Sequence, residues 1–317
     1  MAVIETFELE KSYQVGLWRK RERQALRPLT LAVEAGEIFG YLGPNGAGKT
    51  TTLKLLMGLI YPTAGSATIL GRPLDDRAMK AQIGFLPEQP YFYDYLSARE
   101  LLHYLATVSA VPAKERARRV DQVLERVGLQ EHANVQLRKF SKGMLQRVGI
   151  AQAIVHDPKL IFLDEPMSGL DPIGRREVRD LIQSLKDEGK TVFFSTHILS
   201  DAETLCDRVA VLNNGQLRGI GVVADLAREI SGKIEVIWDG IAALGAITGL
   251  GAETHSSGSA FRAVLPEAML EQAVDVIRST HSRLIAITPL RATLEDFFLQ
   301  KLEADPEGKA ARGGSAS

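Results

Sequence analysis

The chain has almost no cysteine and no marked surplus of either charge. The first shortage excludes internal disulfides and cysteine-based metal sites, and the second argues against a nucleic-acid partner. Cys206 is the only cysteine among 317 residues, so no internal disulfide can form and no cysteine pair offers a zinc or redox site. We expect a protein of a reducing compartment, with Cys206 a small buried side chain on a helix. The 38 basic and 39 acidic residues nearly cancel, which argues against nucleic acid as a partner.

Long apolar runs are also missing. The N-terminus, MAVIE, lacks the basic start and apolar core of a secretory signal. The longest weakly polar stretch, residues 241–252, is short and contains three glycines, whereas a membrane-spanning helix needs about 20 apolar residues. We therefore expect a chain that is soluble by itself and reaches a membrane only through a partner.

Strand-like and helical segments alternate through the first two-thirds of the chain. The apolar run at residues 159–163 is typical of a central parallel strand covered on both faces. Residues 191–195 are expected to form a second buried strand, and residues 83–86 a short one. Helical spacing is found at residues 50–58, 97–156 and 174–188. This order predicts an α/β domain over residues 1–231, with a parallel sheet and a helical subdomain at about 90–156.

After residue 231 the pattern becomes that of a small α+β accessory domain, which we assign to residues 232–303. Its expected strands are 233–238, 260–265 and 284–288, and its expected helices are 266–279 and 293–302. The polar tail, residues 304–317, is rich in Gly, Ala and Ser and is expected to be disordered. A basic run near the N-terminus, residues 18–23, predicts a solvated loop, with a contact to anionic lipid as the alternative.

Residues 43–50 fit the pattern GxxxxGK[ST], with a strand before them and a helix after them. Glycines let successive backbone N–H groups point at phosphate oxygens, and the helix N-terminus adds a partial positive charge. Lys49 is expected to reach the β- and γ-phosphates, and the Thr50 hydroxyl to bind Mg²⁺. A glycine-rich turn without a ligand is the alternative. The predicted ATP-binding loop comprises Gly43, Pro44, Asn45, Gly46, Ala47, Gly48, Lys49, Thr50 and Thr51.

Two acids follow the apolar strand at residues 159–163. Ligands of open α/β sheets bind at the carboxyl ends of the strands. Asp164 is expected to hold Mg²⁺ through its water shell, and Glu165 to activate the water that attacks the γ-phosphate. An apolar strand that ends in two acids is weak evidence alone, but together with the phosphate loop it indicates ATP hydrolysis.

Ser141 stands at the expected start of a helix and has two interpretations. Its hydroxyl is a good N-cap, which would be a structural role. Together with the backbone N–H of Gly143 it would also suit a γ-phosphate. Spacing alone does not decide between the two.

Five motifs together resemble those of the nucleotide-binding subunit of ATP-binding cassette (ABC) transporters. Residues 43–50 match its Walker A motif and residues 160–165 its Walker B motif. FSKGM, residues 140–144, resembles the family signature, residues 168–171 match the D-loop, and residues 195–197 contain the switch histidine. The resemblance covers about residues 1–225 and implies a P-loop ABC ATPase core with ATP and Mg²⁺ as cofactors.

The resemblance also assigns roles to single residues. It implies that Glu165, His197 and Lys49 are catalytic, with His197 contacting the γ-phosphate. It places Tyr13 against adenine, and the remaining nucleotide and metal contacts at Ser141, Gly143, Asp171 and Glu88.

Departures from the general pattern point to one branch of the family. Glu88 stands where a glutamine is usual, and it could approach Mg²⁺ or the attacking water. Lys142 and Met144 replace the usual Gly and Gln of the signature, and residues 294–299 read LEDFFL. These features resemble the ATPases of ABC-2-type exporters, such as drug-efflux and sodium-efflux systems.

Family membership further implies partners. Two copies would pair head to tail, because one chain carries one motif set and each ATP needs Ser141 from another copy. A separate integral membrane permease would be driven from the cytoplasmic face of the membrane, to which this subunit would bind peripherally. Tyr91, Phe92, Tyr93 and Tyr95 stand where the permease docks in the family, although ordinary packing would also explain them.

Two other classes are weighed against the transporter. A soluble ABC ATPase of DNA repair or translation would carry coiled coils, zinc cysteines or a second cassette. A nucleotide-binding regulator without turnover would not need both Glu165 and His197.

Overall fold

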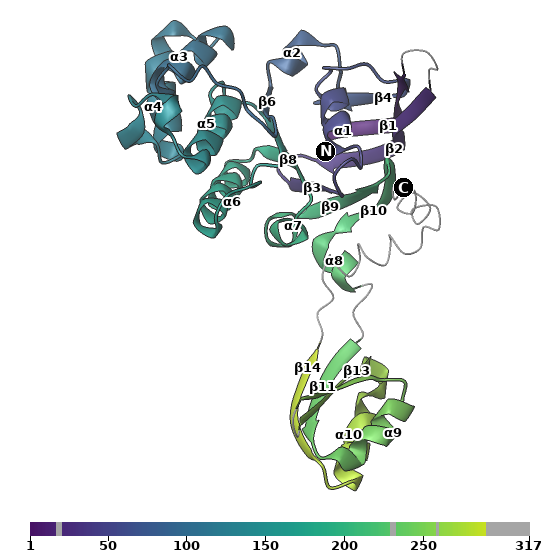
Figure 1. Cartoon of the computed structure of the whole chain (residues 1–317). Helices are drawn as coiled ribbons and strands as arrows, with labels where there is room; N and C mark the ends of the chain where they lie inside the picture. Colours follow the sequence, from purple (N-terminus) through teal and green to yellow (C-terminus); the bar gives the residue numbers. More distant parts are fainter. Residues whose placement is uncertain (17–20, 229–232, 258–259, 290–317) are drawn as a thin grey trace. The chain divides into compact units, whose positions relative to one another are not determined.

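The computed structural model describes residues 1–16, 21–228, 233–257 and 260–289, and the chain divides into two compact units, residues 1–222 and 223–317 (Figure 1). Each unit is described by itself. The predicted domain boundary at residues 231 and 232, the last expected helix at 293–302 and the expected disordered tail lie outside the described residues.

The first unit is built on a six-stranded sheet with the strand order β10-β9-β3-β8-β7-β6. Five of these strands run parallel: β3 (Ile38–Leu42), β6 (Ile83–Leu86), β7 (Leu160–Asp164), β8 (Thr191–Thr196) and β9 (Arg208–Asn213). Strand β10 (Gln216–Val222) pairs antiparallel with β9 at one edge. Every residue of β3, β7 and β8 is buried, including the polar side chains of Asp164, Thr191, Ser195 and Thr196. Burial on both faces is typical of central parallel strands. The predicted parallel sheet of an α/β domain is confirmed.

A second, antiparallel sheet has the order β2-β1-β4-β5. Its strands are β1 (Ala2–Val15), β2 (Arg21–Glu34), β4 (Ala64–Ile69) and β5 (Arg72–Pro73). The expectation of a loop over the whole basic run was wrong, because Arg21, Glu22 and Arg23 belong to β2. Strand β1 supplies their partners, with Tyr13 opposite Arg23, and an edge strand tolerates charged side chains.

Helices cover the sheets and form a separate group beside them. The first unit contains α1 (Lys49–Leu56), α2 (Arg77–Lys80), α3 (Ala98–Val108), α4 (Ala113–Arg126), α5 (Lys142–Ile154), α6 (Pro172–Asp187) and α7 (Leu199–Leu205). The stretch 97–156 forms three separate helices, α3, α4 and α5, which pack together (Figure 1). Helix α3 begins at a capping box between Ser97 and Glu100, and Pro112 precedes α4.

The apolar core of the first unit lies on both sides of the parallel sheet. Aromatic rings of β3, β7 and β8 meet on one face, where Phe193 contacts Phe39, Tyr41 and Phe162. Gly40 leaves room for Cys206, because a Cβ on this glycine would lie 2.5 Å from the cysteine sulfur. Cys206 ends α7 and is half-buried, and burial of its thiol raises the pKa well above the usual value.

The second unit contains a four-stranded antiparallel sheet of order β12-β13-β11-β14. Its elements are α8 (Val223–Arg228), β11 (Lys233–Asp239), α9 (Leu244–Gly249), β12 (Glu253–Ser257), β13 (Ala260–Pro266), α10 (Leu270–Ser279) and β14 (Arg283–Pro289). Trp238 is fully buried in its core and stacks on Phe261. The expected α+β pattern is observed, although helix α10 begins at Leu270, after a 3-10 turn. Within the described part of the chain, no helix combines the length and the apolar content needed to cross a membrane.

Candidate nucleotide site

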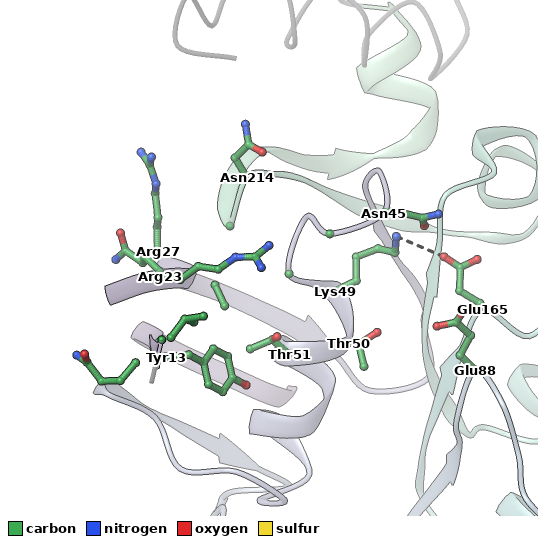
Figure 2. A pocket seen from close by; sticks show the side chains of 18 residues that line it. Tyr13, Arg23, Arg27, Asn45, Lys49, Thr50, Thr51, Glu88, Glu165 and Asn214 are labelled. Atoms are coloured by element: carbon green, nitrogen blue, oxygen red, sulfur yellow. Dashed lines mark ion pairs between the residues drawn. The ribbon is translucent and has the colours of Figure 1, made fainter. Parts of the chain in front are cut away.

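A cleft of about 990 Å³ opens beside the predicted phosphate loop (Figure 2). Its walls come from the β1–β2 hairpin, from the loop between β3 and α1, and from the turn between β9 and β10. The carboxylates of Glu88 and Glu165 also line it. Of the predicted nucleotide residues, the cleft brings together Tyr13, Asn45, Gly46, Gly48, Lys49, Thr50, Thr51, Glu88 and Glu165.

The loop has a backbone shape that glycine favours. Gly46 and Gly48 have left-handed backbone angles, with φ of 81° and 108°. A Cβ on Gly48 would lie 2.5 Å from the carbonyl oxygen of Ala25, so β2 passes directly over the loop. Helix α1 begins at Lys49 without a side-chain cap, which leaves its first N–H groups for a ligand.

The ammonium of Lys49 lies at the mouth of the loop. Its Nζ donates to the carbonyl oxygens of Gly43 at 2.7 Å and of Pro44 at 3.3 Å, and lies 3.3 Å from Oε1 of Glu165. The side chain is only 7% exposed. The ammonium of Lys49 is thus held at the position where the sequence predicts the β- and γ-phosphates.

Glu165 turns the chain at the end of β7 and joins two other predicted catalytic residues. Its left-handed φ of 51° is unusual for a residue other than glycine, and its N–H donates to the carbonyl of Ser195 at 3.1 Å. Oε2 of its carboxylate accepts a hydrogen bond from Nδ1 of His197 at 2.9 Å, while Oε1 faces Lys49. The structure therefore brings Lys49, Glu165 and His197 into one contact network (Figure 2 shows the first two).

Asp164 is the last residue of β7 and is 2% exposed. Its Oδ2 accepts a hydrogen bond from the Thr50 hydroxyl at 3.0 Å, and its Oδ1 accepts one from the Ser195 hydroxyl. Hydroxyl and carboxylate oxygens are ligands that Mg²⁺ prefers, so this pair fits the predicted metal. Glu88 lines the same cleft, but no cluster of three or more His, Cys, Asp or Glu side chains placed to hold a metal occurs in the described residues.

Tyr13 stands at the other end of the cleft. Its side chain is partly exposed and lies beside Thr51, as Figure 2 shows. The ammonium of Lys11 lies 5.2 Å from the centroid of its ring. Tyr13 lines the cleft and Lys11 does not, so we expect a base to reach the ring from the side of the cleft.

Three of the predicted nucleotide-binding residues lie outside the cleft of the phosphate loop. Ser141, Gly143 and Asp171 line a second cleft of about 360 Å³, between α5 and the start of α6. Ser141 accepts a hydrogen bond from the N–H of Met144 at 3.2 Å, and Asp171 accepts one from the N–H of Gly174 at 2.7 Å. Both residues thus cap helices, and within one chain neither lines the cleft of the phosphate loop.

A buried acid stands near the catalytic network. Asp201, on α7, is 3% exposed, and its Oδ2 has no hydrogen-bond partner among the described residues. Burial raises the pKa of its carboxyl, although the charges of Arg175 and Arg179 oppose this effect.

Sequence reasoning missed half of the lining of the cleft. The missed residues are Gln14, Val15, Gly16, Arg23, Gln24, Ala25, Arg27, Asn214 and Gly215. They come from the hairpin and from the turn between β9 and β10, and no motif marks them. The basic run was the one visible signal for Arg23.

Comparison with known proteins gives a consistent result. A family model described as ABC transporter matches residues 26–168. An ABC transporter ATP-binding protein of Synechocystis sp. is 44% identical over 309 residues, covering 95% of this chain and 84% of the relative. The Nod factor export ATP-binding protein I of Cupriavidus pinatubonensis is 36% identical, covering 81% of this chain and 78% of the relative.

A solved structure of similar fold is a dimeric ATP-binding cassette in a post-hydrolysis state, bound to ADP and Pi. It is 28% identical, with a TM-score of 0.63, and the match covers 69% of this chain and 98% of that structure.

Proposed function

Because this chain belongs to the ABC transporter family of ATP-binding proteins, we propose that two copies of it close on ATP and thereby drive export through a separate membrane permease. The chain is the ATP-hydrolysing subunit of a transporter. We further propose that two copies of the chain pair, that they act on a separate membrane permease, that transport is outward, and that the subunit lies at the cytoplasmic face of the membrane. Export is the activity in the printed name of the Cupriavidus relative.

In this proposal the triphosphate lies along residues 43–51. Lys49 binds the β- and γ-phosphates, and Tyr13 stacks on the base. Thr50 and Asp164 would hold Mg²⁺, which would neutralise phosphate charge when bound. Glu88 would approach the same region from the wall that it shares with Glu165.

Hydrolysis needs a base near the γ-phosphate and cations around it. The carboxylate of Glu165 takes the proton of the attacking water, and its contacts with Lys49 and His197 hold it in place. Lys49 stabilises the charge that develops on the phosphate, and His197 reaches it from the other side of Glu165.

The observation that carries the proposed pairing is the separation of two predicted half-sites. Ser141 and Gly143 open onto a cleft other than that of Lys49, so a second copy would have to bring them to the γ-phosphate. The N-terminus of α5 and its capping hydroxyl suit an anion. Asp171, in the same cleft, would approach the dimer interface with them.

Exposed tyrosines support the permease contact. Tyr91, Tyr93, Tyr95 and Tyr104 are 92%, 48%, 61% and 51% exposed, and Tyr93 contacts the rings of Tyr95 and Tyr104. Phe92, in contrast, packs against the core, which favours the packing alternative for that residue. A surface of clustered, exposed tyrosines is typical of protein interfaces.

Isolation from membranes of the native cells tests the proposal. The tagged full-length chain, recovered in mild detergent, is expected to carry a protein with several membrane spans. Replacing Tyr91, Tyr93 and Tyr95 by Ala should reduce that recovery, whereas the control Tyr61→Ala, also at an exposed tyrosine but outside the cluster, should not. Recovery only from the soluble fraction, or together with nucleic acid, would overturn the proposal.

A further inference from the structure

We propose that Arg23, on β2, is a further nucleotide-binding residue whose guanidinium contacts the α-phosphate. The inference deepens the proposed function, since it rests on the placement of the phosphates along residues 43–51. Three observations support it: a bulge places β2 against the phosphate loop, Arg23 pairs with Tyr13, and no described acidic side chain pairs with the Arg23 guanidinium.

A bulge in β2 fixes the position of Arg23. Lys11 pairs with Leu26 and Ser12 pairs with Gln24, so Ala25 is an extra residue without a partner on β1. The carbonyl of Ala25 lies over Gly48, where a Cβ would be 2.5 Å away, and also close to Gly215. The bulge therefore presses β2 onto the phosphate loop at a defined point.

Arg23 lies two residues before this point, which is about 7 Å along a strand. Its direct partner on β1 is Tyr13, the expected base-stacking residue. Arg23 thus stands between the base end and the phosphate end of the cleft, and Figure 2 shows its side chain directed along the cleft toward the loop. The ribose and the α-phosphate of a bound nucleotide would occupy this interval.

Within the described residues, no acidic side chain pairs with the guanidinium of Arg23. Its side chain makes no ion pair or hydrogen bond with any part of the chain that the structure describes. The other cations of the cleft differ, because Lys49 pairs with Glu165 and Arg27 contacts Gln216 at 3.5 Å. A guanidinium that faces a phosphate site, with no counter-charge among the described residues, is suited to bind one or two phosphate oxygens.

The test compares Arg23→Met, which removes the charge but keeps most of the length, with Arg21→Met. Arg21 is the matched control, since it lies two residues further out on β2, is exposed, and does not line the cleft. Binding of ATP, ADP and adenosine would be measured by competition against a fluorescent ATP analogue. A lost hydrogen bond between charged groups predicts about tenfold weaker binding of ATP and ADP alike, with adenosine unchanged. Arg21→Met should bind all three as the wild type does.

Each contrary pattern has a distinct meaning. If Arg23→Met bound ATP more weakly but ADP normally, Arg23 would contact the γ-phosphate. If it bound adenosine more weakly, Arg23 would contact the base. Either result overturns the inference, and so does wild-type affinity of Arg23→Met for all three ligands. The kcat of ATP hydrolysis should stay within about twofold while KM rises, because the contact serves binding. Lys49→Ala separates the two proposals: if it binds ATP as tightly as the wild type, the placement of the phosphates fails, whatever Arg23 does.

Discussion

Glu165 combines two unusual features in one residue, a left-handed backbone and a buried carboxylate shared between a lysine and a histidine. Such strain is kept where the surrounding contacts hold it and where function needs the geometry. The carboxylate stands where a water near the γ-phosphate could be deprotonated, and it is the residue whose charge the proposed reaction needs.

Glu165→Gln keeps the shape of this side chain but removes the base. We expect hydrolysis to fall by at least about a hundredfold while ATP binding persists, and an ATP-bound dimer to accumulate. Steady-state phosphate release and gel filtration with ATP check the two effects. Adding Ser141→Arg to the same variant should abolish the dimer, because it fills the second half-site. Undiminished hydrolysis in Glu165→Gln would exclude the base assignment.

The sequence predicts the parts of this site that follow one another along the chain. Residues 43–51 and the pair Asp164 and Glu165 each belong to one strand, loop or helix, so spacing alone locates them. Arg23 and Asn214 reach the cleft through pairing between strands, and the bulge at Ala25 that positions Arg23 has no local signal. Contacts of this kind depend on the register of the hairpin.

At the scale of elements, buried strands are predicted well because both of their faces are covered, so apolar residues fill most of their positions, as in Leu160–Asp164 and Thr191–Thr196. Sequence patterns predict the wrong secondary structure where a segment with a polar or helix-like sequence pairs with a neighbouring strand. The polar start of β2 looks like a loop, yet β1 supplies its partners, and the strand at Ala260–Pro266 runs into a stretch expected to be helical. Pairing with a neighbouring strand determines the secondary structure of these residues more than their own sequence pattern does.

His156 ties the end of α5 to β6. Its Nε2–H donates to the carbonyl of Ile83 at 2.9 Å, while Nδ1 is buried without a hydrogen-bond partner among the described residues. Burial lowers the pKa of this ring below its usual 6.5, although the hydrogen bond to Ile83 opposes this. Among the neighbouring charges, Arg119 and Lys190 lower the pKa and Asp157 raises it. The folded chain therefore favours the neutral ring, and protonation would leave a buried donor unpaired.

A pH-dependent loss of stability follows. The contribution of His156 is complete above pH 6.5 and is lost as the pH falls through the lowered pKa of the folded state. Between about pH 7.5 and pH 5.5, the melting temperature of His156→Gln should fall less than that of the wild type, because Gln can still donate to Ile83 without titrating. His103→Gln, at an exposed histidine of α3, serves as the control and should follow the wild type. Equal falls in all three proteins would refute the assignment.

At the scale of the whole molecule, each unit has its own apolar core, and the predicted ATP site lies wholly in the first. A ligand that binds only the folded state of one unit stabilises that unit. The chain has two tryptophans, and Trp238 lies in the core of the second unit. In a Trp18→Phe variant, fluorescence then reports on that unit alone.

We expect saturating ATP, in the Glu165→Gln background, to raise the melting temperature of the first unit by about 5 °C or more. The transition reported by Trp238 should not move. Calorimetry and fluorescence on the same sample give the two values. A shift of the Trp238 transition equal to that of the first unit would mean that both units unfold as one cooperative body.

The position of Cys206 has a practical consequence for watching the proposed closure. Its thiol packs against Gly40, and burial raises the pKa of this thiol above its usual value, which disfavours the reactive thiolate. We therefore expect the native chain to react only slowly with maleimide reagents. One cysteine added at an exposed site, such as Ile173 beside the second cleft, would be the main labelled position in each copy. Spin or fluorescent probes attached there would report the approach of two copies as a distance, without removal of the native thiol.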